Sequence, residues 1–597
     1  MKKMLAALEA ARAAGALRDV DLHLANHLLA LEPQPTPELA LAIAALSRAN
    51  ADGNVCLDLA TAAGTRLLAA DAGYAGIPAP AIDAWRETLR ASVLVTDAGA
   101  TESPAPLVLD DQGRLYLQKY FSFERTVADD LAGRLTAPCA VDEAALQRAL
   151  ARCFPGREPD DAQRLAAATA ARRPFAVITG GPGTGKTTTV TRLLAVLLML
   201  AGDAPPRIAL AAPTGKAAAR LGGAIRQATG ELRAAGIDDA LLARIPAEAS
   251  TLHRLLGWQP GNGFRYHAGN RLPVDLVVID EASMIDLSLM ARLLAAVPRD
   301  ARLVLLGDRD QLASVEAGNV LGDLCHPGRS GQAGDATRPI ARSIAVLTRS
   351  HRYPAHSGIG VLARAVNAGD ADAALATFDR HRDTTPWQTV AANALAAQVA
   401  QEVMQHLAGY RRQRAPADAL RAFDGFRFLC ALRDGPFGVD AINRLAERAL
   451  EQAGLVDLRQ RHYAGRPLLV TQNDYGVQLF NGDTGLVLPD ADGVLRAFFP
   501  PGDDQGVRQV ALNRLPAHET CYAMTVHKSQ GSEFDRVALV LPDADSPVLG
   551  RELVYTGITR AKSSVAVWAP RDVLAAAIVR RTQRSSGLRD ALWSSPA

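Results

Sequence analysis

The sequence of 597 residues has little lysine and little cysteine. Only seven of its 65 Lys and Arg residues are Lys, so Arg carries most of the positive charge. Six Cys are scattered along the chain without Cys-x-x-Cys spacing, which argues against a zinc site or an iron–sulfur cluster and favours a reducing compartment. The formal net charge is only +2, which excludes a polycation that coats nucleic acid through net charge alone.

Long apolar runs are also absent. The longest, Leu193–Ala201, is far shorter than the roughly 20 residues that a membrane-spanning helix needs. Near the N-terminus, Glu9 and Arg12 interrupt the apolar residues, so this segment predicts an amphipathic helix and not a signal peptide. We therefore expect a cytoplasmic protein that does not bind a membrane. The composition, 48% hydrophobic and 21% charged, is typical of a globular protein, and the length indicates several domains.

The pattern of apolar residues changes along the chain. The first 100 residues are rich in Ala and Leu with helical periodicity, and a hairpin is expected at 107–109 and 115–117. From about residue 160 strands alternate with helices, which predicts a parallel α/β sheet. The strands expected in this sheet are Ala176–Thr179, Ile208–Ala212, Leu276–Ile279 and Leu303–Leu306.

A second α/β region is expected from about residue 346. Short strands with turn residues such as Asn481–Asp483 interrupt it at about 465–515, where we expect a small inserted β-barrel. The α/β pattern resumes at Val537–Leu541. Between the two α/β regions, Cys325–Arg342 is rich in Gly, Arg and Ser and predicts a surface loop.

A glycine-rich segment carries the clearest chemical signal. Residues 180–187 match G-x-x-x-x-G-K-[ST], between a predicted strand and a predicted helix. Backbone N–H groups of such a loop wrap phosphates, and the positive end of the helix dipole adds to the attraction. Lys186 is expected to reach the β- and γ-phosphates of ATP, and the Thr187 hydroxyl to bind Mg²⁺. The loop residues expected to bind the nucleotide are Gly180, Gly181, Pro182, Gly183, Thr184, Gly185, Lys186, Thr187 and Thr188.

An acidic pair follows the predicted strand Leu276–Ile279. Asp280 would hold Mg²⁺, directly or through water, and Glu281 would polarise the attacking water. An apolar strand that ends in Asp-Glu is weak evidence by itself. Downstream of a phosphate loop it indicates hydrolysis of a nucleoside triphosphate.

Further motifs resemble those of superfamily 1 helicases, in the same order along the chain. The segments are 212–221 (motif Ia), 251–257 (the next motif), 306–312 (motif III), 347–353 (motif IV), 525–533 (motif V) and 551–560 (motif VI). Within that superfamily, segments 430–443, 481–485 and 116–120 are similar to the RecD family, the alpha subunits of exodeoxyribonuclease V.

The resemblance implies an α/β fold with two RecA-like parallel-sheet motor domains. A small helical N-terminal domain would dock on other subunits, and an SH3-like β-barrel would interrupt the second motor domain. The implied boundaries are 1–115 for the N-terminal domain, 116–345 for motor domain 1, 346–464 and 516–597 for motor domain 2, and 465–515 for the barrel.

The resemblance also implies roles for residues outside the phosphate loop. Gln163 would read adenine, because an amide can donate and accept together; the alternative is a surface Gln on a helix. Gln311 would sense the γ-phosphate, and Arg352 and Arg560 would act as arginine fingers. Gly531 and Glu533 would approach the γ-phosphate and the ribose.

Seven residues lie in motifs that line the single-strand channel of similar helicases. Their hydroxyl, amine and backbone N–H groups would bind DNA phosphates, which carry little sequence information. A structural role is the alternative for His253, Lys216 and Lys528. The seven residues are Thr214, Lys216, Thr251, His253, Thr525, His527 and Lys528.

One nuclease type is excluded by an absence. A common metal-dependent nuclease core uses (D/E)-x-K, and no Lys of this chain has an acidic residue two positions before it. The resemblance to the RecD family implies a 5′-to-3′ DNA helicase in a heterotrimer with RecB-like and RecC-like subunits. It would act on single-stranded DNA and duplex ends, in double-strand break repair and recombination. A partner subunit would then cut the DNA.

Three other functions stay open. The chain could be a structural or regulatory subunit with weak ATPase, a stand-alone RecD-like helicase, or a nucleotide-driven switch that does not move on DNA. The intact Lys186, Asp280, Glu281 and Arg560 argue against a vestigial motor. Motifs Ia, III and V argue against the switch, because a switch needs no path for a DNA strand. Stand-alone RecD-like helicases are expected to carry a longer N-terminal extension, which argues against that function for this chain.

Overall fold

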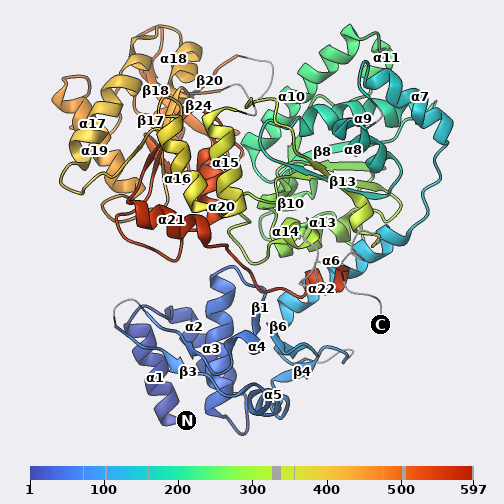
Figure 1. The fold of residues 1–597 in the computed structure, drawn as a ribbon, viewed down its shortest axis with the longest axis vertical. Coiled ribbons are helices and arrows are strands. Elements are labelled where there is room, and N and C mark those ends of the chain that lie inside the picture. The colour runs from blue at the N-terminus through green and yellow to red at the C-terminus, as the bar shows by residue number, and fades with distance from the viewer. Residues whose placement is uncertain are drawn as a thin grey trace.

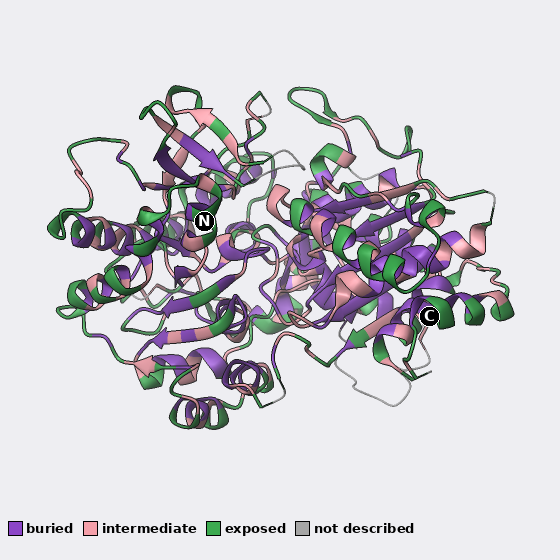
Figure 2. Cartoon of the chain, turned by 90° about the horizontal axis from the view of Figure 1, so that it is seen from above, coloured by how far each residue is buried: buried purple, intermediate pink, exposed green. Residues whose placement is uncertain are grey.

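The computed structural model describes residues 1–70, 73–100, 104–158, 160–202, 204–325, 338–354, 356–474, 476–500 and 506–593. Two α/β bodies lie side by side, and a smaller N-terminal region lies against one end of them (Figure 1). The strands of both bodies are largely buried beneath helices whose outer faces are exposed (Figure 2). Most of the loop predicted at Cys325–Arg342 lies outside the described residues.

The N-terminal region packs helices on a small sheet. Helix α3 is capped by the Thr36 hydroxyl and begins with Pro37, and its residues Leu39–Leu46 are all buried. The predicted hairpin is confirmed as β5 and β6, but it belongs to a four-stranded sheet in the order β1-β6-β5-β4. The elements are α1 (Lys2–Ala13), α2 (Asp19–Leu29), α3 (Pro37–Ala51), β1 (Cys56–Asp58), α4 (Leu59–Ala62), β2 (Arg66–Leu67), β3 (Ile77–Pro78), α5 (Ile82–Arg90), β4 (Val95–Asp97), β5 (Leu107–Leu109) and β6 (Arg114–Leu117).

The first lobe is a six-stranded parallel sheet covered by helices α6–α14. Its strand order is β14-β7-β13-β12-β8-β9, and the four strands predicted from the sequence are all present. The strands are β7 (Phe175–Gly180), β8 (Ile208–Ala212), β9 (Ser250–Thr251), β12 (Leu276–Ile279), β13 (Arg302–Gly307) and β14 (Ile344–Leu347), with a separate hairpin β10 (Trp258–Gln259) and β11 (Gly263–Phe264). The helices are α6 (Gln118–Thr136), α7 (Glu143–Cys153), α8 (Ala162–Ala171), α9 (Lys186–Ala201), α10 (Gly215–Ala234), α11 (Asp239–Leu242), α12 (Leu252–Leu255), α13 (Leu287–Ala296) and α14 (Val320–Cys325).

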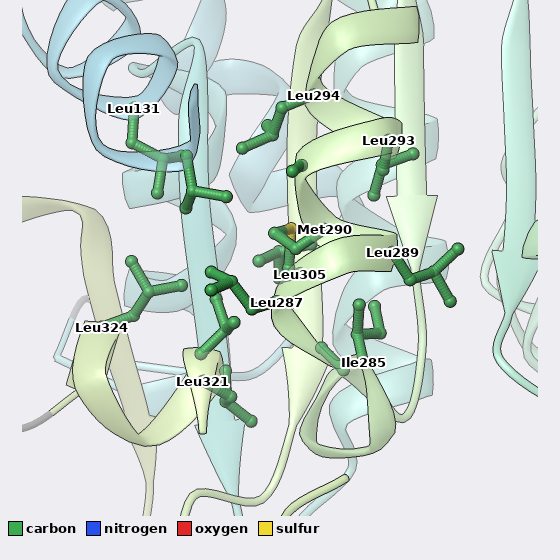
Figure 3. Close-up of a cluster of buried hydrophobic side chains, with 14 of the residues drawn as sticks. Leu131, Ile285, Leu287, Leu289, Met290, Leu293, Leu294, Leu305, Leu321 and Leu324 are labelled. Atoms are coloured by element: carbon green, nitrogen blue, oxygen red, sulfur yellow. The ribbon is translucent and has the colours of Figure 1, made fainter. Parts of the chain in front are cut away.

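Helix α13 shows how this lobe is held together. Met290, Leu293 and Leu294 are almost fully buried, and they lie among side chains from α6, β13 and α14 (Figure 3). Burying a side chain of this size stabilises the fold by roughly 1.5–3 kcal/mol. The packing of α13 therefore stabilises the sheet whose strand ends carry the motifs.

The second lobe is a five-stranded parallel sheet with helices α15–α21. Its strand order is β15-β24-β23-β16-β22, and the strand predicted at Val537–Leu541 is present as β23. The strands are β15 (Trp387–Gln388), β16 (Phe426–Cys430), β22 (Ala523–Thr525), β23 (Phe534–Val540) and β24 (Ala561–Trp568). The helices are α15 (Gly358–Ala368), α16 (Ala371–Arg380), α17 (Leu395–Glu402), α18 (Pro416–Phe423), α19 (Val439–Gln452), α20 (Arg551–Ile558) and α21 (Arg571–Val579).

An antiparallel sheet is inserted in the second lobe where the short strands were predicted. Its order is β20-β19-β18-β17-β21, so among the described residues β20 and β21 are its edges. An antiparallel insertion is therefore present, whereas its closure into an SH3-like barrel stays a prediction. Its strands are β17 (Pro467–Val470), β18 (Thr484–Pro489), β19 (Leu495–Phe499), β20 (Arg508–Ala511) and β21 (His518–Thr520).

After α21 the chain leaves the second lobe and returns to the first (Figure 1). Arg584 donates to the Gly318 carbonyl at 2.7 Å, and the Ser585 carbonyl accepts from the Val55 N–H at 2.9 Å. Helix α22 (Leu588–Trp593) then packs on α6 and α14, and its Leu588 and Trp593 join the first lobe's hydrophobic core. Residues 584–593, expected to belong to the second motor domain, therefore complete the first lobe.

The boundary expected at 115/116 falls inside β6, which runs directly into α6. In the part of the chain that the structure describes, no helix is both long and apolar enough to cross a bilayer.

Candidate functional site

The phosphate loop joins the buried strand β7 to the start of α9. Gly183 and Gly185 have φ of +75° and +83°, and a Cβ at Gly185 would lie 2.2 Å from Gln163 Nε2. Glycine is thus required at Gly185 for conformation and for space. Lys186 Nζ donates to the Gly180 carbonyl at 2.6 Å and to the Gly181 carbonyl at 3.2 Å, so the ammonium group lies within the loop.

The acidic pair lies at the end of β12, which β13 separates from the phosphate-loop strand. Burial and, to a smaller extent, the nearby charge of Glu281 raise the pKa of Asp280 to about 6, although the charge of Lys186 opposes the shift. Glu281 has φ of +51°, and its N–H donates to Asp280 Oδ1 at 2.8 Å. Burial destabilises the negative charge of a carboxylate. A cation bound beside Asp280 would stabilise that charge.

The second lobe contributes arginines to the same space. The Arg560 side chain is 2% exposed, and it donates from Nε to the Thr556 carbonyl at 3.2 Å and from Nη1 to the Ser532 carbonyl at 3.3 Å. Arg352 forms an ion pair with Glu533, and its Nη1 is buried with no hydrogen-bond partner. The guanidinium groups of Arg352 and Arg560, which are permanently charged, therefore face the phosphate loop from the opposite lobe.

These groups line one cavity of about 190 Å³, the phosphate-loop cavity. It brings together thirteen of the residues that the sequence selected, and adds Ala217, Arg220 and Leu221 of α10. The selected residues that line it are Pro182, Gly183, Thr184, Gly185, Lys186, Thr187, Thr188, Asp280, Glu281, Gln311, Arg352, Glu533 and Arg560.

Four selected residues lie beside the cavity without lining it. Gly180 packs against Leu347, and Gly181 lies close to the Tyr555 hydroxyl. Gly531, with φ of +71°, lies against Ala217 of α10. Gln163 is the fourth of these residues, and its hydrogen bonds indicate what kind of ligand the site can bind.

Gln163 is buried at the first turn of α8 and is not a surface residue. Its Nε2 donates to the Thr184 carbonyl at 3.0 Å, whereas its Oε1 is buried with no hydrogen-bond partner. Gln311 donates from Nε2 to Asp308 Oδ2 at 3.1 Å, and its Oε1 also has no partner. Buried acceptors without donors are costly, so both amides fit a site that is completed by a ligand with N–H or O–H groups.

Hydrogen bonds join the two lobes next to the cavity. The Leu312 N–H donates to Thr556 Oγ1 at 2.9 Å, and Gln530 Nε2 donates to the Leu312 carbonyl at 2.9 Å. The Tyr555 hydroxyl donates to Asp308 Oδ2 at 3.0 Å. Motifs III, V and VI are thus connected directly, and a change at the phosphates can reach both lobes.

A second and larger space, the α10 groove, lies on the other side of the start of α10 and has a volume of about 1130 Å³. Trp258 and Tyr266 of the first lobe line it, and Phe480 and Arg508 of the inserted sheet line it from the opposite side. Of the seven residues expected to bind DNA, Lys216 and Thr251 line this groove. Flat rings and a cation in an open groove suit an extended chain of stacked, charged units.

The other residues expected to bind DNA do not line this groove, and they make contacts within the protein. The Thr214 hydroxyl caps α10, and the Thr525 hydroxyl accepts from the Lys528 N–H at 3.2 Å. Lys528 forms an ion pair with Glu519. Burial lowers the pKa of both His253, whose ring contacts Phe264, and His527.

Lys216 differs from Lys528 in its surroundings. Its Nζ lies 5.9 Å from the centre of the Phe534 ring, whereas Lys528 pairs with a carboxylate. Burial lowers the pKa of Lys216, and the charge of Asp424 opposes that shift. A phosphate at the groove would stabilise the ammonium form.

Sequence reasoning missed several residues in or beside the two spaces. Arg220, Asp308 and Tyr555 lie in the quoted motifs, but nothing in the sequence distinguished them from their neighbours. The aromatic residues of the α10 groove gave no signal either, since their proximity depends on how the inserted sheet docks.

Comparison with known proteins identifies the family. The protein-family model described as "RecBCD enzyme subunit RecD, N-terminal domain" matches residues 13–116. Two further family models match, an AAA domain at residues 163–317 and a UvrD-like helicase C-terminal domain at residues 520–568. The RecBCD enzyme subunit RecD of Mycobacterium tuberculosis is 44% identical over 97% of this chain and 96% of its own length. The chain belongs to the RecD family.

The RecD family likeness extends to a differently named relative. The ATP-dependent RecD2 DNA helicase of Deinococcus radiodurans is 32% identical over 76% of this chain, but over only 54% of its own length. Among solved structures, the Pif1 helicase from Candida albicans covers 70% of this chain and 95% of its own, with 16% identity and a TM-score of 0.39.

Proposed function

We propose that this chain, an ATP-dependent DNA helicase of the RecD family, moves 5′ to 3′ on single-stranded DNA as one subunit of a helicase–nuclease complex. The observation that carries the proposal is the phosphate-loop cavity, where Lys186 and Asp280 of one lobe face Arg352 and Arg560 of the other. A ligand bound there touches both lobes, so binding and hydrolysis can close and open them.

The cavity residues fit ATP and Mg²⁺. The unpartnered Oε1 of Gln163 can accept from the adenine amino group, while the unpartnered Oε1 of Gln311 can accept from the attacking water. The Thr187 hydroxyl and Asp280 would hold Mg²⁺, which would neutralise charge on the phosphates. Glu281 would take the proton of the water that attacks the γ-phosphate, while Arg352 and Arg560 would stabilise the charge that develops as the bond to the β-phosphate breaks.

Movement on DNA would follow from the connection between the two spaces. Helix α10 borders the cavity through Arg220 and the α10 groove through Lys216. The hydrogen bonds of Leu312 with Thr556 and Gln530 join motif III to motifs V and VI. Closing of the lobes around ATP would therefore shift the walls of the groove, and opening after hydrolysis would return them. Each ATP hydrolysed would then move the chain one step along the DNA.

The complex would supply what this chain lacks. RecB-like and RecC-like subunits are the proposed partners, the N-terminal region is the proposed docking surface, and the nuclease site is proposed to lie on a partner. A stand-alone RecD-like helicase is the main alternative, and a structural subunit with weak ATPase is the other. The intact cavity supports a motor over a structural subunit.

Strand displacement tests this proposal. The purified chain, alone and with its partner subunits, is given ATP and a duplex with either a 5′ or a 3′ tail, with Lys186→Gln as the control. Unwinding from the 5′ tail only, absent in the control and without strand cleavage, is the expected result. Unwinding from the 3′ tail would overturn the direction, and unwinding by the chain alone at the rate of the complex would favour the stand-alone alternative.

A further inference from the structure

The first turns of α10 separate the two spaces of the site. Gly215, Lys216, Ala218 and Ala219 line the α10 groove, whereas Ala217, Arg220 and Leu221 line the phosphate-loop cavity. Arg220 thus reaches the cavity from the first lobe, opposite the two arginines of the second.

Arg220 and Arg352 share one counter-ion. Both side chains form an ion pair with the same oxygen of Glu533, Oε1, which joins the two lobes across the cavity. The Arg220 side chain is 44% exposed, so it is accessible to a ligand, while Glu533 is 16% exposed. One carboxylate oxygen cannot satisfy two guanidinium groups, each of which has five N–H donors.

The charges of the cavity lining are unbalanced. Its basic side chains are those of Lys186, Arg220, Arg352 and Arg560, and its acidic side chains are those of Asp280, Glu281 and Glu533. In the proposed function Asp280 faces Mg²⁺ and Glu281 faces the attacking water, which leaves Glu533 as the anion for the arginines. The lining therefore favours an additional anion that carries several negative charges.

We propose that Arg220 binds the terminal phosphates of the nucleotide from the first lobe, and that Glu533 holds Arg220 and Arg352 until those phosphates replace its carboxylate. The proposal rests on the proposed ATPase. Lys216 lies one turn before Arg220 on α10, so a DNA strand bound in the groove acts on the helix that carries this phosphate ligand.

Steady-state ATPase kinetics of the full chain test the role of Arg220, with and without an oligo-dT strand. Arg220→Gln is expected to lower kcat about 100-fold, as loss of one charged donor to the transition state does, and Arg220→Lys less. Affinity for oligo-dT without nucleotide should stay within about twofold. Arg233→Gln is the matched control, because Arg233 lies on the same helix and pairs with Asp239 outside both spaces.

Three results separate the possible failures. A kcat of Arg220→Gln within twofold of the wild type would overturn the role of Arg220. So would parallel losses of kcat, oligo-dT affinity and thermal stability, because they would show a structural role. A wild-type chain that hydrolyses no ATP, even with its partner subunits, would overturn the proposed function instead.

Inorganic tripolyphosphate tests the role of Glu533, because it offers phosphates without a ribose or a base. Its competition against a fluorescent ADP analogue gives its affinity. Glu533→Gln should bind tripolyphosphate about fivefold more tightly than the wild type, since the competing carboxylate charge is gone, and Arg220→Gln should bind it more weakly. Unchanged or weaker binding by Glu533→Gln would overturn the exchange of the carboxylate for phosphate.

Discussion

The phosphate-loop cavity and the α10 groove share one helix but are built differently. The cavity has a volume of about 190 Å³ and is lined by loop glycines and charged side chains from both lobes. The groove has a volume of about 1130 Å³, and the rings of Trp258, Tyr266 and Phe480, small residues and charged side chains of both signs line this larger space. Charges at fixed points select one small polyanion, whereas an open groove with rings accepts an extended chain of any base sequence. Substitutions can therefore impair one space and leave the other.

Removal of the loop ammonium group should have the largest effect. We expect Lys186→Gln to lower ATPase activity about 10²–10³-fold, because it removes the cation that contacts the terminal phosphates. Affinity for single-stranded DNA, measured by fluorescence anisotropy without nucleotide, should not change. Lys562→Gln is the control, since that Lys is half-exposed and pairs with Asp535. Equal losses of ATPase and DNA affinity would show that the two spaces cannot be separated.

A substitution in the groove should do the reverse. Trp258 is 40% exposed and lines the groove, so Trp258→Ala should weaken binding of single-stranded DNA by about 1–3 kcal/mol, the usual contribution of a stacked base. ATPase activity without DNA should stay unchanged. Leu455→Ala, at an exposed apolar residue outside the groove, provides the comparison for DNA affinity. Wild-type affinity of the Trp258 variant would mean that bases do not stack there.

The raised pKa of Asp280 should make the cavity, but not the groove, sensitive to mild acid. Protonated Asp280 cannot bind Mg²⁺, so metal affinity should be full above pH 7 and fall as the pH drops through about 6. The Mg²⁺ concentration for half-maximal ATPase should rise about tenfold between pH 7 and pH 5. Asp280→Asn should lower activity and abolish this pH dependence; the same dependence in that variant would assign it to another group.

Loss of the base-reading amide should have the smallest effect. Gln163→Ala removes up to two hydrogen bonds to adenine, each with a net contribution of about 0.5–1.5 kcal/mol. The ratio of kcat/KM for ATP over GTP should fall about tenfold, with kcat for ATP reduced less. Gln147→Ala is the matched control, because Gln147 is exposed on α7 and bonds only Glu143 among the described residues. An unchanged ratio of kcat/KM for ATP over GTP would show that Gln163 only supports the phosphate loop, through its hydrogen bond to the Thr184 carbonyl.

The cavity was predictable from the sequence because parallel strands end at one edge. The loop after β7, Asp280 after β12 and Asp308 after β13 meet there, so local motifs become one site as soon as the sheet forms. Arg220 was not predictable, because only its contact with Glu533, 313 positions away, distinguishes it from other arginines. The rings of the groove depend on how the inserted sheet docks on α10, where Phe480 approaches Gly215. Strands β1 and β4 are three residues each, which leaves too short a pattern to detect, and β1 pairs with the distant strand β6.

The return of residues 584–593 to the first lobe has a consequence for biosynthesis. Leu588 and Trp593 complete a core to which β7, β12 and β13 also contribute, so that lobe cannot finish folding when its own strands leave the ribosome. Nearly 250 residues separate Leu347, the end of β14, from Trp593, and at about 5–20 residues per second they take roughly 12–50 s to synthesise. During that time the core lacks Leu588 and Trp593, so the part of the first lobe that these two side chains cover stays exposed to water.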